Sequence, residues 1–485
     1  MFILLLLWTP PFLASLLAVA VRPDRRWAGR TNVVLSAVSF GASVWLCGLV
    51  LARGAALGGP ADLWRVDALS ALLALCIAFV SMLASALGPG VEPGDGSDPA
   101  AARRFRIFSN AFALTMLLAV TIQNVALMWV AIEATTITSA LAIPLERTKA
   151  SVEASWKYIL ICSVGIALAF TGTVLAYFDF VSTAGQRPGA LNWSVLRDAA
   201  PSLHPELLQL AFAFILVGYG TKAGLAPMHT WLPDAHSEAP SAISAMMSGV
   251  LLAVAMYAIA RWKAVVDAAL TPGFTNALLL GAGLLSVGIG SFSLVIQRHY
   301  KRMLAYSSVE HIGLVGVGFA LGPAGTFAAL LHLVNHAVAK SMAFLLAGRV
   351  LGRYQTTEID GVSGLLKTMP WTGPLFAAVV LALVGLPPFG IFLSEFLLVR
   401  AAVMSGHLWL AAALLVLLLT AFISLMNHLN RMLYGSAREG VKVGEARGWG
   451  VIALGACALV LAALGLALPQ HVTALLHQSV ANLIR

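Results

Sequence analysis

Long apolar runs recur along the whole of this 485-residue sequence. Each run is about 20 residues long, the length that an α-helix needs to cross roughly 30 Å of hydrocarbon. Only helices and closed barrels satisfy their backbone polar groups inside lipid, so runs of this length predict an all-α polytopic membrane protein with about fourteen transmembrane helices. The predicted spans are 2–21, 31–52, 66–88, 105–122, 124–144, 154–178, 205–226, 240–262, 273–296, 303–321, 324–348, 372–398, 408–430 and 449–468.

Composition supports this class and excludes others. Hydrophobic residues make up 60% of the chain and charged residues only 11%, which no soluble domain of this length would show. The net charge of +9 would suggest nucleic acid in a soluble protein, but here it is the position of Lys and Arg relative to the membrane that matters. Most of them follow odd-numbered spans, so these loops are predicted to face the cytoplasm and both termini the outer side.

Neither the N-terminal apolar run nor the cysteines indicate a cleaved signal peptide or a cofactor site. Met1 to Val21 has no basic residues before its apolar core, so we expect it to be retained as the first span. The four cysteines fall inside apolar runs without CxxC spacing, so we expect packing residues and no iron–sulfur, zinc or haem site in this chain. They are Cys47, Cys76, Cys162 and Cys457.

A lysine lies in one of the apolar runs, just before the helix is broken. The stretch 218–240 reads GYGTKAGLAPMHTWLPDAHSEAP, where a glycine and two prolines interrupt the backbone after Lys222. A charge at membrane depth costs about 2.5–3.5 kcal/mol on insertion scales, so Lys222 is expected to face a polar cavity and to have a partner. We predict that the partner is Glu133; the alternative is a hydrogen-bonded acid that only fixes packing. Movement of Glu133 relative to Lys222 would switch the lysine between holding and releasing a proton.

Titratable residues crowd the turn after this break. His229, Asp234, His236 and Glu238 form either a proton-collecting vestibule or a set of helix caps that contacts a neighbouring subunit; a zinc site is not expected. Lys157 lies near the cytoplasmic start of its span, where it either snorkels to the interface or takes part in transport.

A file of titratable residues marks the eleventh predicted span. His332, His336 and Lys340 recur every fourth residue and therefore stack along one helix face, over about 12 Å. One histidine in such a helix would more often be a core residue, whereas three aligned groups ending in a lysine predict a proton relay.

Further candidates lie in the neighbouring spans. Glu310 and His311 fall in the tenth span, and Glu395 follows a second break, GLPPFGIFLSEFLLV, in the twelfth. His428 lies near the cytoplasmic end of the thirteenth span, where an interfacial and a transport role are both open.

The two breaks lie five spans apart and in opposite orientation. That is the arrangement of inverted repeats, whose discontinuous helices meet the transported ion near the midplane. We therefore predict N-terminal scaffold helices 1–3 in residues 1–104, a first five-helix repeat (helices 4–8) in 105–265, a second (helices 9–13) in 266–433, and helix 14 with a tail in 434–485.

Four ordered motifs give the chain a family resemblance. KAGLAPMHTWLPDAHSEAP, LAYSSVEHIGL, HLVNHAVAKSMAFL and GLPPFGIFLSEF together resemble the antiporter-like membrane subunits of respiratory complex I, Mrp cation/proton antiporters and energy-converting hydrogenases. Within this superfamily, AHSEAPSAISAMMSGVLL and WKYILICSVGIALAFTGTVLAYF look most like hydrogenase-4 component F, of the formate hydrogenlyase type.

The resemblance implies roles for the candidate residues. It implies a fourteen-helix fold with a proton channel in which Glu133 and Lys222 are the first-half pair. Lys340 would be the central lysine, with His332 and His336 beside it, and Glu395 the terminal residue of the second half.

The chain departs from the family pattern in the eighth span. Ala253 stands about where many complex I relatives carry lysine or histidine. The link between the halves is therefore expected to rely on water, on Ser248 or Tyr257, or on Glu310 and His311.

The function implied is that of a proton-translocating subunit of a membrane-bound energy-converting hydrogenase in a prokaryotic cell (inner) membrane. Nickel–iron and iron–sulfur centres are expected in partner membrane and soluble subunits, with no cofactor in this chain and no nucleic acid partner. The alternatives are a subunit of a Mrp-type sodium/proton antiporter, a proton-pumping complex I subunit, a non-transporting scaffold, and the membrane subunit of a carbon-dioxide hydration complex.

Overall fold

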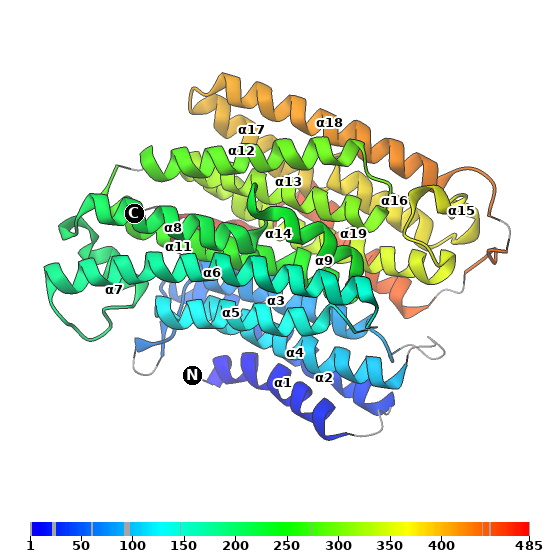
Figure 1. Cartoon of the computed structure of the whole chain (residues 1–485), viewed down its shortest axis with the longest axis horizontal. Helices are drawn as coiled ribbons and strands as arrows, with labels where there is room; N and C mark the ends of the chain where they lie inside the picture. The colour runs from blue at the N-terminus through cyan, green and yellow to red at the C-terminus, as the bar shows by residue number, and fades with distance from the viewer. Residues whose placement is uncertain are drawn as a thin grey trace.

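The computed structural model describes residues 2–21, 26–59, 62–91, 98–145, 147–271, 273–438, 440–445 and 448–484. Met1 and Arg485, which begin and end the first and last predicted domains, lie outside the described residues. The described chain is almost entirely helical, and most helices run along one common axis (Figure 1). The single sheet among the described residues is a two-stranded antiparallel ribbon of β1 (Leu57–Gly58) and β2 (Arg65–Val66), with Leu57 opposite Val66.

The α-helices are α1 (Phe2–Ala20), α2 (Arg26–Arg53), α3 (Ala68–Ala86), α4 (Pro99–Thr121), α5 (Val125–Ala142), α6 (Lys149–Ala184), α7 (Trp193–Ala199), α8 (Pro205–Ala223), α9 (Trp231–Glu238), α10 (Ser241–Met246), α11 (Leu252–Ala269), α12 (Gly273–Val295), α13 (Tyr300–Ala320), α14 (Gly322–Tyr354), α15 (Leu365–Thr368), α16 (Thr372–Leu383), α17 (Gly390–Met404), α18 (Leu408–Leu433), α19 (Trp449–Leu466) and α20 (Gln470–Leu483). Short 3₁₀ turns occupy η2 (Ala200–Ser202), η3 (Met228–Thr230) and η5 (Ile359–Gly361), and a π-helical turn occupies η4 (Met247–Leu251).

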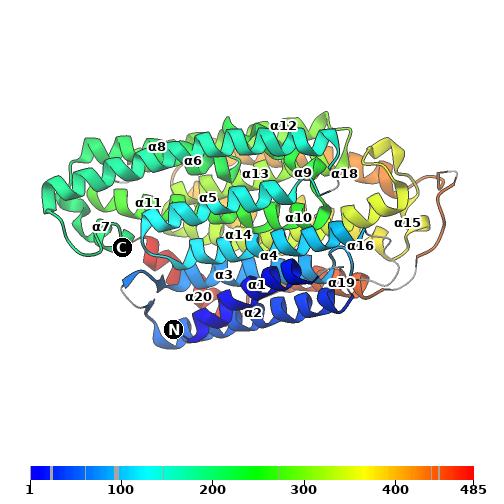
Figure 2. The same ribbon diagram turned by 60° about the horizontal axis from the view of Figure 1, so that its bottom comes forward.

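The bundle has two distinct ends, which we name after the short helices found there. At the α7 end lie the connections from α2 to α3, from α6 to α8 and from α11 to α12; at the α15 end lie those from α12 to α13, from α14 to α16 and from α18 to α19 (Figures 1 and 2).

Twelve helical segments of the described chain are long and apolar enough to cross a membrane. The two other predicted spans are also helical. One is α4, which carries three arginines among its first eight residues; the other is divided between α16 and α17, each too short to cross alone. The chain is thus an all-α multi-pass membrane protein, whereas the count of fourteen spans and the division into two inverted repeats stay predictions.

Polar side chains fix where several helices begin. Asp67 accepts a hydrogen bond from the backbone N–H of Ser70 and so caps α3, and Asn124 caps α5 by accepting from the N–H groups of Ala126 and Leu127. Thr148 does the same for α6, which begins earlier than the sequence pattern predicts. Each cap satisfies a helix-terminal N–H and contributes about 1 kcal/mol.

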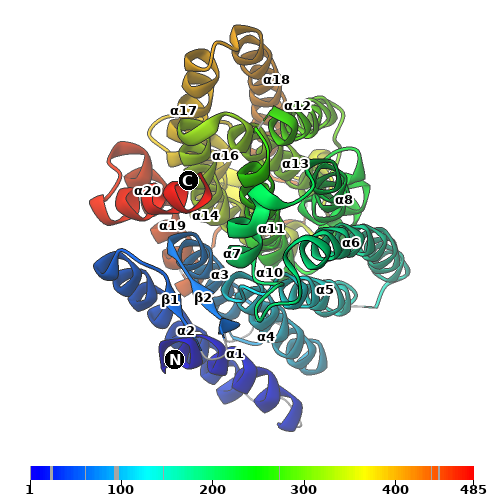
Figure 3. The same cartoon turned by 90° about the vertical axis from the view of Figure 1, so that its left-hand side faces the viewer.

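The segment of α10, η4 and α11 occupies the centre of the bundle. Every residue in the apolar stretch of 241–269 that could cross the membrane is buried within the chain. Viewed along the axis from the α7 end, α11 lies beside α8, with α1 and α2 on one flank and α17 and α18 on the opposite flank (Figure 3). A π-helical turn such as η4 widens a helix locally and often lies at a functional site.

Helix α20 was not predicted. It is amphipathic, with Leu475, Leu476, Ser479 and Val480 buried on one face, and packs mainly on α3 and α14. Arg197, in α7, donates a hydrogen bond of 3.0 Å to the carbonyl of Asn482 in its last turn.

At the α15 end, the connection between α18 and α19 is tied to the bundle through Glu445. This carboxylate accepts hydrogen bonds from Arg349 at 2.9 Å and from the backbone N–H of Thr372 at 2.9 Å. Burial alone would raise the pKa of Glu445, but these bonds, a third from the Thr372 hydroxyl and the charge of Arg349 outweigh it and hold the pKa below its ordinary value.

Candidate functional site

The first break places Lys222 in the last turn of α8. The helix ends at Gly224, which has a φ of +76° and donates its N–H to the carbonyls of Gly220 and Thr221. Beyond it, the N–H of Ala226 is bonded to the hydroxyl of Ser286 in α12 at 2.8 Å. The break is therefore anchored to a neighbouring helix rather than left as loose backbone.

Lys222 is fully buried and is held by neutral oxygen atoms. Its ammonium donates to the hydroxyl of Thr136 at 2.9 Å and to that of Tyr158 at 2.5 Å, and lies 4.8 Å from the centre of the Tyr158 ring. Thr136 in turn donates to Glu133 at 3.1 Å, and Ser163 donates to the other Glu133 oxygen at 3.1 Å.

Lys222 and Glu133 are thus connected through the Thr136 hydroxyl. We name Glu133, Thr136, Tyr158 and Lys222 the Lys222 array. Sequence reasoning identified its two charged members and missed the hydroxyls. Thr136 lies one turn after Glu133 on α5, and this spacing was the available signal.

Glu133 is only half-buried, in contrast to Lys222. Its neighbours on the outer face of α5 are exposed apolar residues, including Val130 at 51% and Ile137 at 57%. On α6, Trp156, Leu160 and Val164 extend this face. A carboxylate therefore lies at the edge of a lipid-like surface, where a charge is costly unless another protein covers it.

The four titratable groups after the first break do not form one cluster. Asp234 pairs with Arg302 of α13 at 3.1 Å and with Lys157 of α6 at 3.5 Å, near the protein surface at the α15 end. His236 is instead fully buried, with its ring stacked 5.1 Å from that of Phe344 in α14.

The other two differ again. His229 is buried, with its ring 6.3 Å from that of Tyr306, and Glu238 is exposed. Lys157 has 49% of its side chain exposed and also pairs with Glu153 at 2.7 Å, a position that fits the interfacial interpretation.

The file on α14 is fully buried and is completed by α13 and α17. His311 shares a hydrogen bond of 3.0 Å with His332, which shares another of 2.9 Å with the hydroxyl of Ser394. The ring of His336 lies 5.5 Å from that of His311, and neither of its nitrogens has a hydrogen-bond partner within the described chain. Buried imidazoles without protein partners are normally solvated by internal water.

Lys340, at the end of the file, is also bound by neutral oxygen atoms. Its ammonium donates to the hydroxyl of Ser307 at 2.7 Å and to the carbonyl of Leu304 at 3.0 Å. The same carbonyl accepts from Ser308, whose hydroxyl lies 2.7 Å from that of Ser248 in η4. We name Ser248, Ser307, Ser308 and Lys340 the Lys340 array.

The two acids of the second half are buried. Glu310 accepts a hydrogen bond of 3.4 Å from Ser291 of α12. Glu395 lies on α17 just beyond the second break, with its carboxylate against Gly385, where a Cβ atom would collide with Oε2. Gly385 has a φ of +67°, so a glycine is required there for both reasons.

His428 does not lie with the file. Its Nε2 is bonded to the carbonyl of Leu294 at 2.9 Å, which ties α18 to the last turn of α12.

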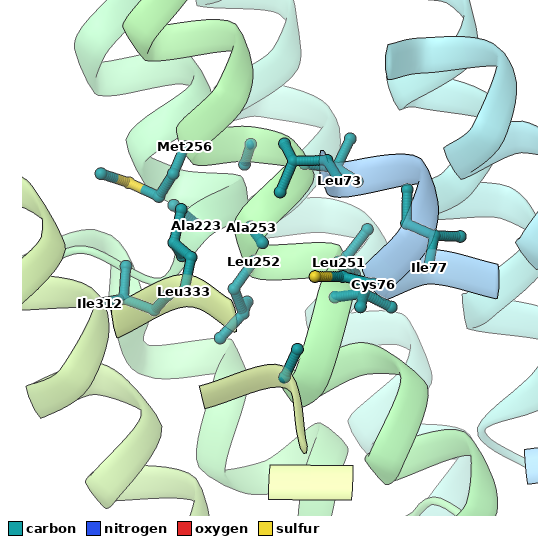
Figure 4. Close-up of a cluster of buried hydrophobic side chains, with 14 of the residues drawn as sticks. Leu73, Cys76, Ile77, Ala223, Leu251, Leu252, Ala253, Met256, Ile312 and Leu333 are labelled. Atoms are coloured by element: carbon teal, nitrogen blue, oxygen red, sulfur yellow. The ribbon is translucent and has the colours of Figure 1, made fainter. Parts of the chain in front are cut away.

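An apolar layer surrounds Ala253 at the centre of the bundle. Leu252, Ala253 and Met256 from this central helix meet Ala223 of α8, Ile312 of α13 and Leu333 of α14 (Figure 4). These last three residues each directly follow a titratable residue, namely Lys222, His311 and His332. The layer therefore lies against both halves of the site. It is apolar because position 253 carries an alanine and no charged residue.

Ser248 and Tyr257, which were expected to link the two halves, have different surroundings. Ser248 belongs to the Lys340 array, whereas the Tyr257 hydroxyl is bonded at 3.1 Å to the carbonyl of Val120 and at 3.1 Å to the hydroxyl of Ser70. Tyr257 therefore points away from Lys340, toward the start of α3.

No group of three or more His, Cys, Asp or Glu side chains in the described ranges is arranged to hold a metal ion. The four cysteines are buried and unpaired.

Comparisons with known proteins identify related membrane proteins. Residues 123–423 match the family model described as NADH:quinone oxidoreductase/Mrp antiporter, transmembrane. The chain is 39% identical over 385 residues to a Hydrogenase-4 component F homolog of Methylacidiphilum infernorum (isolate V4), covering 78% of this chain and 80% of that one. It is 31% identical over 346 residues to Hydrogenase-4 component B of Escherichia coli (strain K12), covering 68% and 49% respectively.

A solved structure shows the same fold over the whole chain. It is a chain of the membrane-bound sulfane sulfur reductase, an archaeal respiratory membrane complex, with a TM-score of 0.89 and 24% identity, covering 100% of this chain and 98% of that one.

Proposed function

Because the chain belongs to the NADH:quinone oxidoreductase/Mrp antiporter membrane family, we propose that it translocates protons as one subunit of a membrane-bound, energy-converting hydrogenase complex. The similarity to hydrogenase-4 components F and B supports the choice of complex. Redox chemistry would take place on nickel–iron and iron–sulfur centres of partner subunits, and this chain would supply the route for the proton.

The observation that carries the proposal is the state of the two buried lysines. Lys222 and Lys340 are completely enclosed, and each is bound by neutral oxygens, with no carboxylate of the described residues within 4 Å. A buried ammonium without a counter-ion is poorly stabilised, so small changes in the surrounding charge decide whether it keeps its proton. A proton-transfer site requires this property, whereas in a scaffold it would only destabilise the fold.

Glu133 is the group that can supply this change in charge. Its carboxylate reaches Lys222 through one hydroxyl, so rotation of the Thr136 side chain or approach of the carboxylate would replace a bridged contact by a direct one. Direct contact favours the charged lysine, and withdrawal favours release of its proton. Because Glu133 lies at the surface, a partner subunit covering α5 and α6 could drive the movement.

The second half would carry the proton between Lys340 and Glu395. His332, His336 and His311 form a continuous buried set of imidazoles beside Lys340, with Ser394 next to Glu395. Each neutral imidazole can accept a proton on one nitrogen while releasing one from the other, so the set suits a relay assisted by internal water. Within the Lys340 array, Ser248 and Ser308 would carry the route from Lys340 toward the apolar layer.

We further propose that the protein resides in a prokaryotic cell (inner) membrane with its α15 end toward the cytoplasm and both termini outside. Basic loops gather at the α15 end, where Lys157 and Arg302 pair with Asp234. Other membrane and soluble subunits would cover the exposed apolar faces.

The test is redox-driven proton uptake by inverted membrane vesicles that hold the assembled complex. Lys222→Ala and Glu133→Gln are each expected to lower proton uptake at least tenfold while hydrogenase turnover with artificial acceptors continues. His428→Gln, off the relay, serves as the matched control. Uptake at the wild-type rate in both variants would show that the chain is a scaffold. Uptake that requires sodium on the opposite side would favour the Mrp-type antiporter instead.

A further inference from the structure

A second polar cluster lies on the other side of the apolar layer, toward the α7 end. Arg261 of α11 donates to Asp67 at 2.5 Å and to the hydroxyl of Ser70 at 3.2 Å, and that hydroxyl lies 3.1 Å from the hydroxyl of Tyr257. Asp67 and Arg261 are at most 3% exposed, so this is a buried ion pair. We name Asp67, Ser70, Tyr257 and Arg261 the α7-end array.

This array continues the face of α11 on which Ala253 lies. Positions 253, 257 and 261 are four residues apart and so fall on one side of the helix, spanning about 12 Å. Ser248, further along the same central segment, belongs to the Lys340 array. One helix therefore carries polar groups on both sides of a single apolar layer.

Several polar atoms of the array have no partner in the part of the chain that is described. They are Oδ2 of Asp67 and both Nε and Nη1 of Arg261. A buried polar atom without a hydrogen bond destabilises the folded protein, because it loses its hydration and gains no partner in return. The unpartnered carboxylate oxygen is thus a place where a proton or a water molecule would be bound.

The array lies close to the surface of the bundle. The Arg261 guanidinium stacks 4.3 Å from the ring centre of Trp193, and the guanidinium of Arg197 lies 5.4 Å from the same ring. Arg197 pairs with Asp198, whose side chain is 78% exposed. A chain of contacts through Trp193 and Arg197 therefore links Arg261 to the exposed Asp198 at the α7 end.

We propose that Asp67, Ser70 and Tyr257 form a proton-transfer site at the α7 end, with Asp67 as the terminal acceptor and Arg261 as the residue that positions it. This rests on the proposed proton transport and adds a route along α11 that leaves the bundle separately from Glu395. The Arg261 guanidinium stabilises the ionised Asp67 carboxylate, so Asp67 holds a proton only briefly and releases it to the adjacent surface.

The transfer is balanced by one proton. A water molecule bound at Oδ2 of Asp67 gives up the proton: one of its O–H bonds breaks as an O–H bond forms on Oδ2. That water regains a proton from the Tyr257 and Ser70 hydroxyl pair, and the pair regains one from a second internal water molecule on the side of the apolar layer. The Tyr257 hydroxyl, at present bonded to the carbonyl of Val120, has to turn away from it for this step.

The experiment uses the same inverted vesicles with the whole complex, and proton uptake is normalised to the amount of assembled complex. Asp67→Asn keeps an oxygen that can accept from Ser70 and Arg261 but cannot take up a proton, and Asp67→Glu restores the carboxylate. Asp67→Asn is expected to lower uptake at least tenfold and Asp67→Glu to restore most of it. Asp67→Asn also leaves the buried Arg261 without its counter-ion, so a purely structural role would lower the amount of assembled complex while uptake per assembled complex stayed at the wild-type rate.

Tyr257→Phe removes one hydroxyl only and decides the question if Asp67→Asn does not assemble. It is expected to lower uptake at least fivefold, and the double variant with Asp67→Asn to be no worse than Asp67→Asn alone, because both act on one path. The matched control is Asp267→Asn, which removes an acid paired with Lys263 on the same helix and near the same end.

Two results would overturn the inference. One is wild-type uptake in both Asp67→Asn and Tyr257→Phe while Lys222→Ala abolishes it, which leaves the proposed function standing. The other is an increased passive proton leak without redox turnover in Asp67→Asn, which would make the ion pair a seal. If Lys222→Ala also pumps normally, the proposed function itself fails.

Discussion

Replacement of Gly385 by alanine tests how the second broken helix holds Glu395. Gly385 has a φ of +67°, where a residue with a Cβ atom loses about 1–2 kcal/mol of stability. The added Cβ would also collide with the Glu395 carboxylate, and overpacking of this kind costs about 1–3 kcal/mol more. Gly385→Ala is therefore expected to lose about 2–5 kcal/mol, and to lower proton uptake because the carboxylate is displaced.

A matched glycine isolates the backbone contribution. Gly406, between α17 and α18, has a φ of +78° with no atom within 4 Å of its ideal Cβ position. Gly406→Ala should therefore lose only the backbone part, about 1–2 kcal/mol. Glu395→Ala introduced beside Gly385→Ala should recover the difference, because it removes the colliding group.

The assay is reversible unfolding of the purified protein in mixed detergent micelles, with proton uptake measured in parallel. Equal losses for Gly385→Ala and Gly406→Ala would refute the reasoning, because the carboxylate would then not rest on Gly385. The same holds if Glu395→Ala fails to relieve any of the loss in the double variant.

Three further predictions follow from contacts described above. Tyr158→Phe leaves the Lys222 ammonium with one hydroxyl acceptor fewer, so we expect about 1–3 kcal/mol lower stability and slower proton uptake, checked by the same two assays. Ser248→Ala removes the bond to Ser308 and should slow uptake several-fold at a loss of about 1 kcal/mol. Ser424→Ala on α18, whose hydroxyl donates to the Thr420 carbonyl of its own helix, should leave uptake unchanged. The folded pKa of Glu445 is below its ordinary value of 4.5, so its contribution to the free energy of unfolding is present above about pH 4.5 and is lost as the pH falls through the folded pKa. The difference in stability between wild type and Glu445→Gln, measured by thermal unfolding, should therefore narrow only below about pH 4.5.

Apolar length and helical spacing made much of this molecule predictable. Runs of about 20 residues located the crossing helices, and the four-residue spacing of His332, His336 and Lys340 correctly placed them on one buried face. Glycine and proline after Lys222 and before Glu395 located the two breaks. These are local signals, carried by residues close together in the sequence.

Contacts between distant segments were not predictable. Asp67 and Arg261 are 194 residues apart, and no local sequence pattern in either segment predicts that they pair. Thr136 and Tyr158 are ordinary hydroxyl residues until the fold brings them to Lys222. His236 and Asp234 were grouped because they are neighbours in sequence, but residues two apart on a helix point in different directions. Helix α20 was not predicted because its 14 residues are too few to cross a membrane.

The half-exposure of Glu133 has a practical consequence for work on this protein. A carboxylate at the rim of the bundle experiences whatever medium covers α5 and α6, and the strength of its attraction for Lys222 scales inversely with the local dielectric constant. Detergent, lipid and a neighbouring subunit are three different media. The attraction between Glu133 and Lys222 therefore differs between the isolated chain and the assembled chain, and the choice of amphiphile becomes a variable in every measurement on this pair.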